Sequence, residues 1–355
     1  MKRTLFHLYS YNDIDHIVPV IWKMLVQGEA AEAVMLDPFY RTDEDPRLVF
    51  LSQYEKFQIR SCDKFSSLNA IERFLKKEDI RVCVFEWGES YARGREPFFK
   101  AAMNLKIPKV ALPHGLTTNF NPARFRVGSN LNQESMVRAD CNCYEAYVFQ
   151  STYHQKAEIK AGMRKEMLHV LGSARFCDEW VDELKRIYPS FELKEAMENK
   201  KRMAVMLPHW KPEIDKVGGL QLIRSLNKSD NWEVRLKEHT RKGTGDLPEL
   251  VTTDVPSFSL IQWASCVLNF GSSIGLDAIL LGKPHIVPKY LISEPSIFDS
   301  DGVSFQMLSP DDFHISFTED RKLFNKSEEI REILQGPENS DSVLNGYIEL
   351  IKAFH

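Results

Sequence analysis

The stretch CVLNFGSSIGLDAILLGKPHIVP, residues 266 to 288, decides the expected fold. It predicts a buried strand over 266–270 that ends at Asn269-Phe270, a turn of small residues at Gly271-Ser272-Ser273, an apolar helix over 273–281 and a second short strand over 285–288. Gly282 and Pro284 close the helix, as these residue types commonly do. A strand that turns directly into a helix and returns as a strand is the repeating unit of a parallel sheet.

The same alternation of short apolar and longer amphipathic runs continues outward along most of the chain. We expect strands over residues 4–8, 31–36, 81–85, 109–112, 147–149, 169–171, 203–207 and 232–236, and helices over 14–25, 67–77, 96–105, 155–161, 219–226, 259–264 and 343–353. This pattern predicts an α/β protein with two Rossmann-like domains that face each other across a cleft, where the carboxyl ends of the strands converge.

A polar, highly charged stretch over residues 178–201 is expected to link the domains. We place a first, acceptor-side domain at 1–170 and a second, nucleotide-binding domain at 171–340. The last residues, 341–355, are expected to form a helix that packs back on the first domain.

The composition is that of an ordinary globular protein, with 43% apolar and 27% charged residues. A formal net charge of −4 argues against a general polyanion binder, so no nucleic-acid partner is expected. The six cysteines are scattered and lack zinc-like spacing, which favours reduced thiols in a cytoplasmic protein. No stretch is long and apolar enough to cross a bilayer, so any membrane association would be peripheral, at the inner face of the cytoplasmic membrane.

The turn at Gly271-Ser272-Ser273 is the first candidate binding site. Two serine hydroxyls and the backbone amides that open a helix can bind a phosphate. The alternative is that the serines only cap the helix. A second candidate follows the strand at 232–236, where Lys237 and His239 offer a positive charge and an imidazole. The alternative there is a solvated surface loop.

Two candidate sites lie in the first half of the chain. Glu86 and Glu89 follow a buried strand, and a carboxylate there could act as a general base or stabilise a cationic sugar carbon. His114 follows another strand and precedes Gly115, which permits close backbone approach. The alternatives are a surface acidic loop and a structural histidine. The remaining cleft candidates at predicted strand ends are Gly172, Ser173, Pro208 and His209.

Taken in order, these segments resemble bacterial surface-polysaccharide glycosyltransferases of the GT-B fold. The segments at 237–239 and 272–284 look like the HP and SS motifs of capsule Kdo transferases and bacterial sialyltransferases, although Thr240 stands where those families usually have Pro. A similar layout occurs in teichoic-acid CDP-glycerol transferases and, more distantly, in UDP-GlcNAc 2-epimerases.

The resemblance implies a metal-independent glycosyltransferase with no resident cofactor, whose co-substrate is a nucleotide sugar. Lys237, His239, Ser272 and Ser273 would bind the donor phosphate, with a CMP-linked sugar such as Kdo or a sialic-acid-like sugar expected. The acceptor would be a glycan or lipid-linked glycan of the bacterial lipopolysaccharide or capsule. A CDP-polyol phosphotransferase, a sugar-nucleotide epimerase or hydrolase, and a non-catalytic binding subunit remain alternatives.

Overall fold

The protein forms two compact units, neither of which is a continuous piece of chain. Unit 1 comprises Met1–Leu116, Pro122–Trp180 and Arg331–His355, and unit 2 comprises Thr117–Asn121 and Val181–Ile330. The computed structural model describes residues 2–9, 11–35, 44–87, 96–113, 115–116, 118, 139–190, 200–208, 210–238, 245–251, 255–299, 302–313, 328–337 and 342–355.

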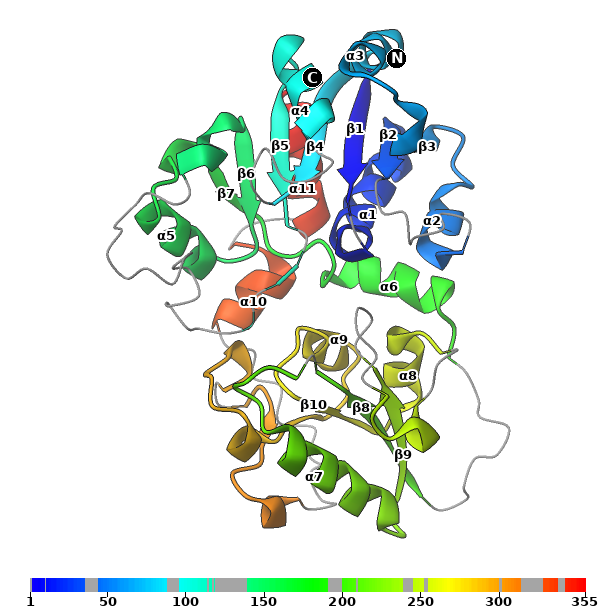
Figure 1. The fold of residues 1–355 in the computed structure, drawn as a ribbon, viewed down its shortest axis with the longest axis vertical. Coiled ribbons are helices and arrows are strands. Elements are labelled where there is room, and N and C mark those ends of the chain that lie inside the picture. The colour runs from blue at the N-terminus through cyan, green and yellow to red at the C-terminus, as the bar shows by residue number, and fades with distance from the viewer. Residues whose placement is uncertain are drawn as a thin grey trace. The chain divides into compact units, whose positions relative to one another are not determined.

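Within its described residues, unit 1 holds a seven-stranded parallel sheet in the order β3-β2-β1-β4-β5-β6-β7 (Figure 1). The chain runs outward from β1 through β2 to β3, then resumes on the other side of β1 at β4. Such a reversal of direction leaves room for ligands at the carboxyl ends of the two central strands. The strands are β1 (Arg3–Leu8), β2 (Ala30–Met35), β3 (Phe57–Ser61), β4 (Ile80–Glu86), β5 (Lys109–Leu112), β6 (Ala146–Phe149) and β7 (Leu168–Val170).

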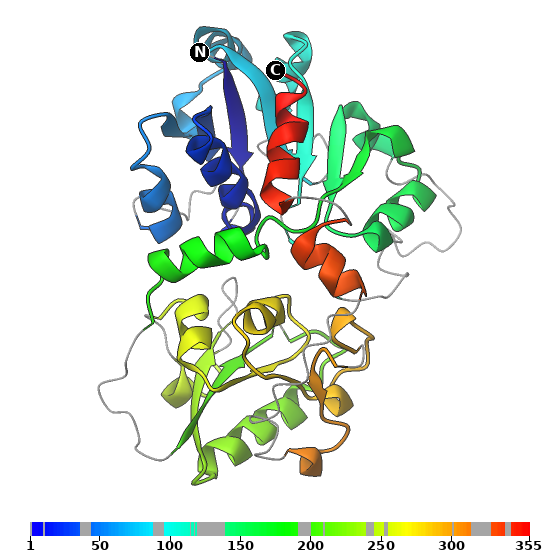
Figure 2. The same cartoon turned by 180° about the vertical axis from the view of Figure 1, so that it is seen from behind.

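Helices cover both faces of this sheet, so most residues of its central strands β1, β2 and β4 are buried. On one face, Ile71 and Leu75 of α3 and Phe98 of α4 share a buried cluster with Phe85 of β4. On the other, α1 and α11 pack side by side (Figure 2). The helices are α1 (Tyr11–Val26), α2 (Pro46–Leu51), α3 (Leu68–Lys77), α4 (Glu96–Asn104), α5 (Thr152–Lys160) and α11 (Val343–Lys352), with α6 (Asp178–Ile187) and α10 (Glu328–Gln335) spanning the boundaries to unit 2.

Unit 2 is built around a five-stranded parallel sheet, again counting its described residues, in the order β12-β11-β10-β8-β9. The chain leaves β8 for β9 on one side and returns to β10 on the other, so β8 and β10 flank the reversal point. The strands are β8 (Lys201–Met206), β9 (Trp232–Lys237), β10 (Cys266–Asn269), β11 (His285–Val287) and β12 (Phe305–Gln306).

Alternate residues of β8 enter two separate cores. Met203 and Val205 pack with Leu222 and Ile223 of α7. Ala204, on the opposite face, packs with the apolar residues of α8 and α9. This is the side-chain alternation of a strand buried on both faces. The helices are α7 (Lys216–Lys228), α8 (Ser257–Trp263) and α9 (Gly275–Leu280).

The structure contains elements that the sequence pattern did not predict. Strand β3 was missed because only Phe57 of its residues is buried, so the strand carries no apolar run. Helix α2 is too short to show a periodic pattern, and its start depends on local chemistry, with Pro46 in the first turn and the Asp45 carboxylate accepting the Arg47 amide. Strand β12 and helix α10 were also missed.

The cysteine thiols are all free, and most of them are buried. Burial raises the pKa of Cys62, Cys83, Cys177 and Cys266 to about 12. These groups are therefore structural thiols rather than nucleophiles at neutral pH. Among the described residues, none of the helices is long and apolar enough to cross a membrane.

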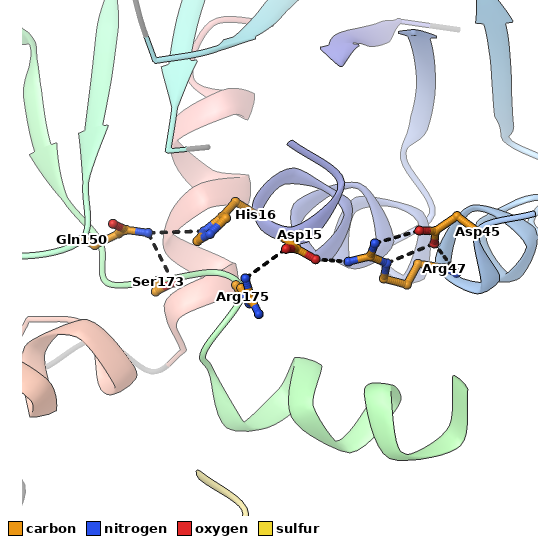
Figure 3. A network of polar contacts seen from close by, with 7 residues as sticks. All are labelled: Asp15, His16, Asp45, Arg47, Gln150, Ser173 and Arg175. Carbon is orange, nitrogen blue, oxygen red and sulfur yellow. Dashed lines mark hydrogen bonds and ion pairs between the residues drawn. The ribbon is translucent and has the colours of Figure 1, made fainter. Parts of the chain in front are cut away.

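A buried ion network ties three segments of unit 1 together at the carboxyl edge of its sheet (Figure 3). The carboxylate of Asp15, on α1, accepts hydrogen bonds from Arg47 of α2 and, at 3.0 Å, from Arg175 in the segment after β7. Arg47 also donates to both carboxylate oxygens of Asp45. Burial raises the pKa of Asp15, but the charges of Arg175, Arg47 and His16 outweigh it, so the net pKa lies below the ordinary value of 3.8.

We expect Asp15→Asn to destabilise unit 1 by about 3 kcal/mol at pH 7, because it leaves Arg175 with a neutral partner in a largely buried place. Since the folded pKa is lowered, the carboxylate's contribution is full above the unfolded pKa near 3.8 and disappears as pH falls through the folded value. Urea unfolding at pH 7 and at pH 3 measures both effects. The matched control is Asp182→Asn, which breaks an exposed pair with Lys185 and should cost below about 0.5 kcal/mol. Equal losses for the two variants at pH 7 would contradict the network's role.

Candidate functional site

The candidate site of unit 2 lies where β8, β9 and β10 end. Met206 is the register partner of both Lys237 on β9 and Asn269 on β10. Neighbouring strands lie about 4.8 Å apart, so the ends of β9 and β10 are separated by about 10 Å at the same edge of the sheet. The turn 271–274 follows β10 at the reversal point of the sheet and is half-buried throughout.

Every carbonyl of this turn is already hydrogen-bonded within the protein. The hydroxyl of Thr118 donates to the carbonyl of Gly271 at 2.7 Å. The carbonyl of Ser272 accepts from the Asn269 side chain at 2.7 Å and from the amide of Gly275 at 3.0 Å. The carbonyls of Ser273 and Ile274 accept from the amides of Leu276 and Asp277.

In contrast to its carbonyls, several hydrogen-bond donors of the turn have no partner among the described residues. Among the described residues, no hydrogen-bond partner is found for the amides of Ser273 and Ile274 or for the hydroxyls of Ser272 and Ser273. A turn with its acceptors occupied and its donors available favours an anion, because a bound phosphate oxygen can only accept hydrogen bonds. Gly271, at φ +82°, provides the left-handed backbone that opens the turn.

The serines do not cap the helix that follows. Helix α9 begins at Gly275, two residues later than the sequence predicted, and its N-cap residue Ile274 makes no side-chain capping bond. The capping alternative considered for Ser272 and Ser273 is therefore wrong. At the other end, Gly282 adopts φ +64° and closes the helix as predicted.

In unit 1, Glu86 ends strand β4 beside the reversal point of that sheet. Its side chain is 5% exposed, and its register partner is Leu112 of β5. The next residue, Trp87, fixes the strand end by donating from its amide to Leu112 and from its indole to the carbonyl of Val148 at 2.7 Å. The position suits the acceptor-side role expected for Glu86, which stays a prediction.

Gly172 and Ser173 lie in unit 1 and hold its packing together. Gly172 has φ +81°, and its carbonyl accepts from the buried hydroxyl of Tyr347 at 2.8 Å. Ser173 is fully buried; its amide donates to Ile333, and its hydroxyl lies 3.4 Å from the side-chain nitrogen of Gln150 (Figure 3). Nothing in these contacts requires a ligand.

Other predicted residues are located only in part. Lys237 is the half-buried last residue of β9, Pro208 is buried just after β8, and Gly115 is half-buried beyond β5. The remaining predicted residues, Glu89, His114, His209 and His239, lie outside the described residues.

The sequence reasoning missed several residues that shape the turn. Asn269 was predicted to end a strand and to begin the candidate donor-site segment 269–284, but it was given no role of its own, although a polar residue closing an otherwise apolar strand was a usable signal. His285 opens an apolar strand in the same way. Thr118 could not have been found, because its contact with Gly271 joins segments that are remote in the sequence.

Comparison with known proteins supports the fold. No protein-family model and no curated protein matches the chain. Among solved structures, S. aureus MnaA with UDP is 13% identical over 100% of this chain and 97% of its own, with a TM-score of 0.61. The UDP-N-acetylglucosamine 2-epimerase of Rickettsia bellii is 14% identical over 99% and 96%, with a TM-score of 0.60. The wall teichoic acid polymerase TagF, solved with CDPG, is 13% identical over 99% and 88%, with a TM-score of 0.56.

Glycosyltransferases are also among the similar structures. Identities this low establish a shared fold and leave the activity open. The chain therefore has the predicted GT-B fold of two Rossmann-like α/β units, and the structures it resembles include UDP-N-acetylglucosamine 2-epimerases and glycosyltransferases. The finer resemblance to Kdo transferases and sialyltransferases stays a prediction.

We expect Gly172→Ala to destabilise the protein through packing. An added Cβ would lie 2.8 Å from the amide nitrogen of Gly336, in backbone that cannot move aside cheaply. The control is Gly245→Ala, which has a similar φ of +65° but open space around the position. Urea unfolding should show Gly172→Ala less stable than the control by about 2 kcal/mol. Equal stabilities would contradict the packing role.

Proposed function

We propose that the protein is a glycosyltransferase that moves a sugar from a nucleotide-activated donor to a glycan acceptor. In this proposal the turn 271–274 of unit 2 binds a phosphate of the donor. The observation that carries it is the turn's arrangement of occupied carbonyls and available donors at the reversal point of a parallel sheet.

The chemistry follows from where negative charge develops. When the bond between the sugar and the phosphate breaks, the leaving phosphate gains charge, and hydrogen-bond donors already in place stabilise it without reorganisation. Ser272, Ser273 and the turn amides would supply those donors, with Lys237 adding a positive charge and His239 an imidazole donor. Glu86 or Glu89, together with His114, would take the acceptor hydroxyl's proton or stabilise a cationic sugar carbon.

The identity of the donor is part of the proposal. The motif resemblance favours a CMP-linked sugar such as Kdo or a sialic-acid-like sugar, whereas similar structures were solved with UDP or CDPG. Because the fold resembles that of the R. bellii epimerase, a sugar-nucleotide epimerase is the second candidate function. Because it also resembles that of TagF, a CDP-polyol phosphotransferase is the third.

A thermal-shift screen against CMP, CDP, UDP and GDP should identify the base, because a ligand that binds only the folded state raises the unfolding midpoint. With the nucleotide found, Ser272→Ala/Ser273→Ala should weaken binding about 100-fold in titration calorimetry. Two charge-assisted hydrogen bonds are lost, while the turn amides remain.

The matched control is Ser265→Ala, an exposed serine just before β10, at the opposite end of the same strand. It should bind nucleotide like the wild type. Unchanged affinity in the folded double variant would show that the phosphate binds elsewhere.

The reaction class is tested by products. Incubated with the nucleotide sugar alone, a glycosyltransferase should leave the sugar unchanged apart from slow hydrolysis, and should form a glycoside only when a glycan acceptor is added. Mass spectrometry and NMR of the products measure this outcome. An epimerised nucleotide sugar formed without acceptor would favour the second candidate, and a phosphodiester product would favour the third.

A further inference from the structure

A chain of buried polar side chains runs beneath the turn, across three neighbouring strands of unit 2. Ser304 lies just before β12, His285 opens β11 and Asn269 ends β10. The distance from Ser304 Oγ to His285 Nδ1 is 2.7 Å, and that from His285 Nε2 to Asn269 Nδ2 is 3.1 Å. All three residues are buried, and His285 also packs edge-on against the ring of Phe298.

The backbone of Ser272 fixes the orientation of the Asn269 carboxamide. The amide of Ser272 can only donate, so the atom 3.2 Å from it must be the oxygen, Oδ1. The carbonyl of Ser272 can only accept, so the atom 2.7 Å from it must be the nitrogen, Nδ2. One side chain therefore satisfies both polar backbone groups of Ser272.

That orientation determines the protonation of His285. The second hydrogen of Nδ2 faces Nε2 of the imidazole, so Nε2 must be the bare acceptor and Nδ1 must carry the proton, donating it to Ser304. Burial lowers the pKa of His285 to about 3, which keeps the ring neutral throughout the physiological range.

The start of helix α9 rests directly on this pair. A Cβ at Gly275 would lie 2.5 Å from Nε2 of His285 and 2.7 Å from Nδ2 of Asn269. Only a residue without a side chain allows the helix to approach so closely. The pair thus contacts the turn at Ser272 and at Gly275, on both sides of the free amides of Ser273 and Ile274.

We propose that Asn269 and His285 are positioning residues for the phosphate turn, with the Nδ1-protonated imidazole holding the Asn269 carboxamide so that the turn presents donors and no carbonyl to the ligand. This inference rests on the proposed function and adds to it the reason why the turn is preformed. Preformed donors avoid the ordering cost that a flexible turn would incur on binding.

The test compares two replacements of the imidazole. His285→Gln retains an acceptor for the Asn269 amide, and His285→Leu has a comparable size without one. Titration calorimetry with CMP, UDP and CDP should show His285→Gln within about threefold of the wild type and His285→Leu at least about tenfold weaker, the effect of leaving one buried donor unpaired. Gly282→Ala, at the far end of α9 with φ +64° and open space, controls for general destabilisation and should retain wild-type affinity.

Two measurements without nucleotide separate this inference from the proposed function. In the wild type, ¹⁵N NMR should show His285 in the Nδ1–H tautomer, and hydrogen exchange should show a protected Ser272 amide. Protection should fall about tenfold in His285→Leu and persist in His285→Gln. An Nε2–H tautomer, or equal protection and equal affinity in both variants, would overturn the inference. If the wild-type protein binds none of the nucleotides of the screen, UDP and CDP included, the proposed function is overturned. Hydrogen exchange of the Ser272 amide would then still test whether His285 positions the turn.

Should His285→Leu fail to fold, Ser304→Ala carries the test. It removes the acceptor that holds the proton on Nδ1, so we expect a mixture of tautomers and weaker UDP or CDP binding. A wild-type tautomer together with wild-type affinity in this variant would overturn the inference.

Discussion

The candidate site depends on one side-chain amide, that of Asn269. A strand that ends inside a protein leaves backbone groups without partners, and leaving them buried and unpaired is costly. Asn269 resolves this in part by bonding both the amide and the carbonyl of Ser272, three residues beyond the end of β10. The position of Ser272 and the close approach of Gly275 at the start of α9 follow from that arrangement. The parallel sheet sets the place, because the ends of its strands meet at one edge.

The polar groups at the carboxyl edge of the sheet differ in kind between the two units. At the sheet edge of unit 1, two carboxylates and two guanidinium groups form ion pairs in the network around Asp15 (Figure 3). Around the turn of unit 2, the buried side chains of Asn269 and His285 are neutral, and the turn itself offers hydrogen-bond donors. Charge that is already balanced holds helices in place, whereas neutral, donor-rich backbone remains available to an incoming anion.

The sequence alone predicted the fold class, most strands and helices, and the turn itself, because apolar runs buried on both faces and a Gly-Ser-Ser turn are local signals. It did not predict β3, in which only Phe57 is buried, or the hydrogen-bonded chain of Asn269, His285 and Ser304. A buried hydrogen bond between neighbouring strands depends on register, and register is set by packing rather than by any one residue. The placement of Gly172 in unit 1 shows the same limit: a Gly-Ser pair after a strand looks like a ligand turn until Tyr347 and Gly336 fill its surroundings.

The contact between Thr118 and Gly271 has a consequence for how the protein can be divided and synthesised. Unit 2 includes Thr117–Asn121, about 60 residues before the rest of the unit begins, so the contiguous fragment 181–330 lacks the hydroxyl that donates to the Gly271 carbonyl. During translation, Thr118 leaves the ribosome long before Gly271 does, so their hydrogen bond can form only after Gly271 has been synthesised. This contact adds a long-range loop closure to the folding of that unit. Transfer of residues 181–330 alone to another protein would therefore lose the Thr118 hydroxyl, and the Gly271 carbonyl would need another hydrogen-bond donor.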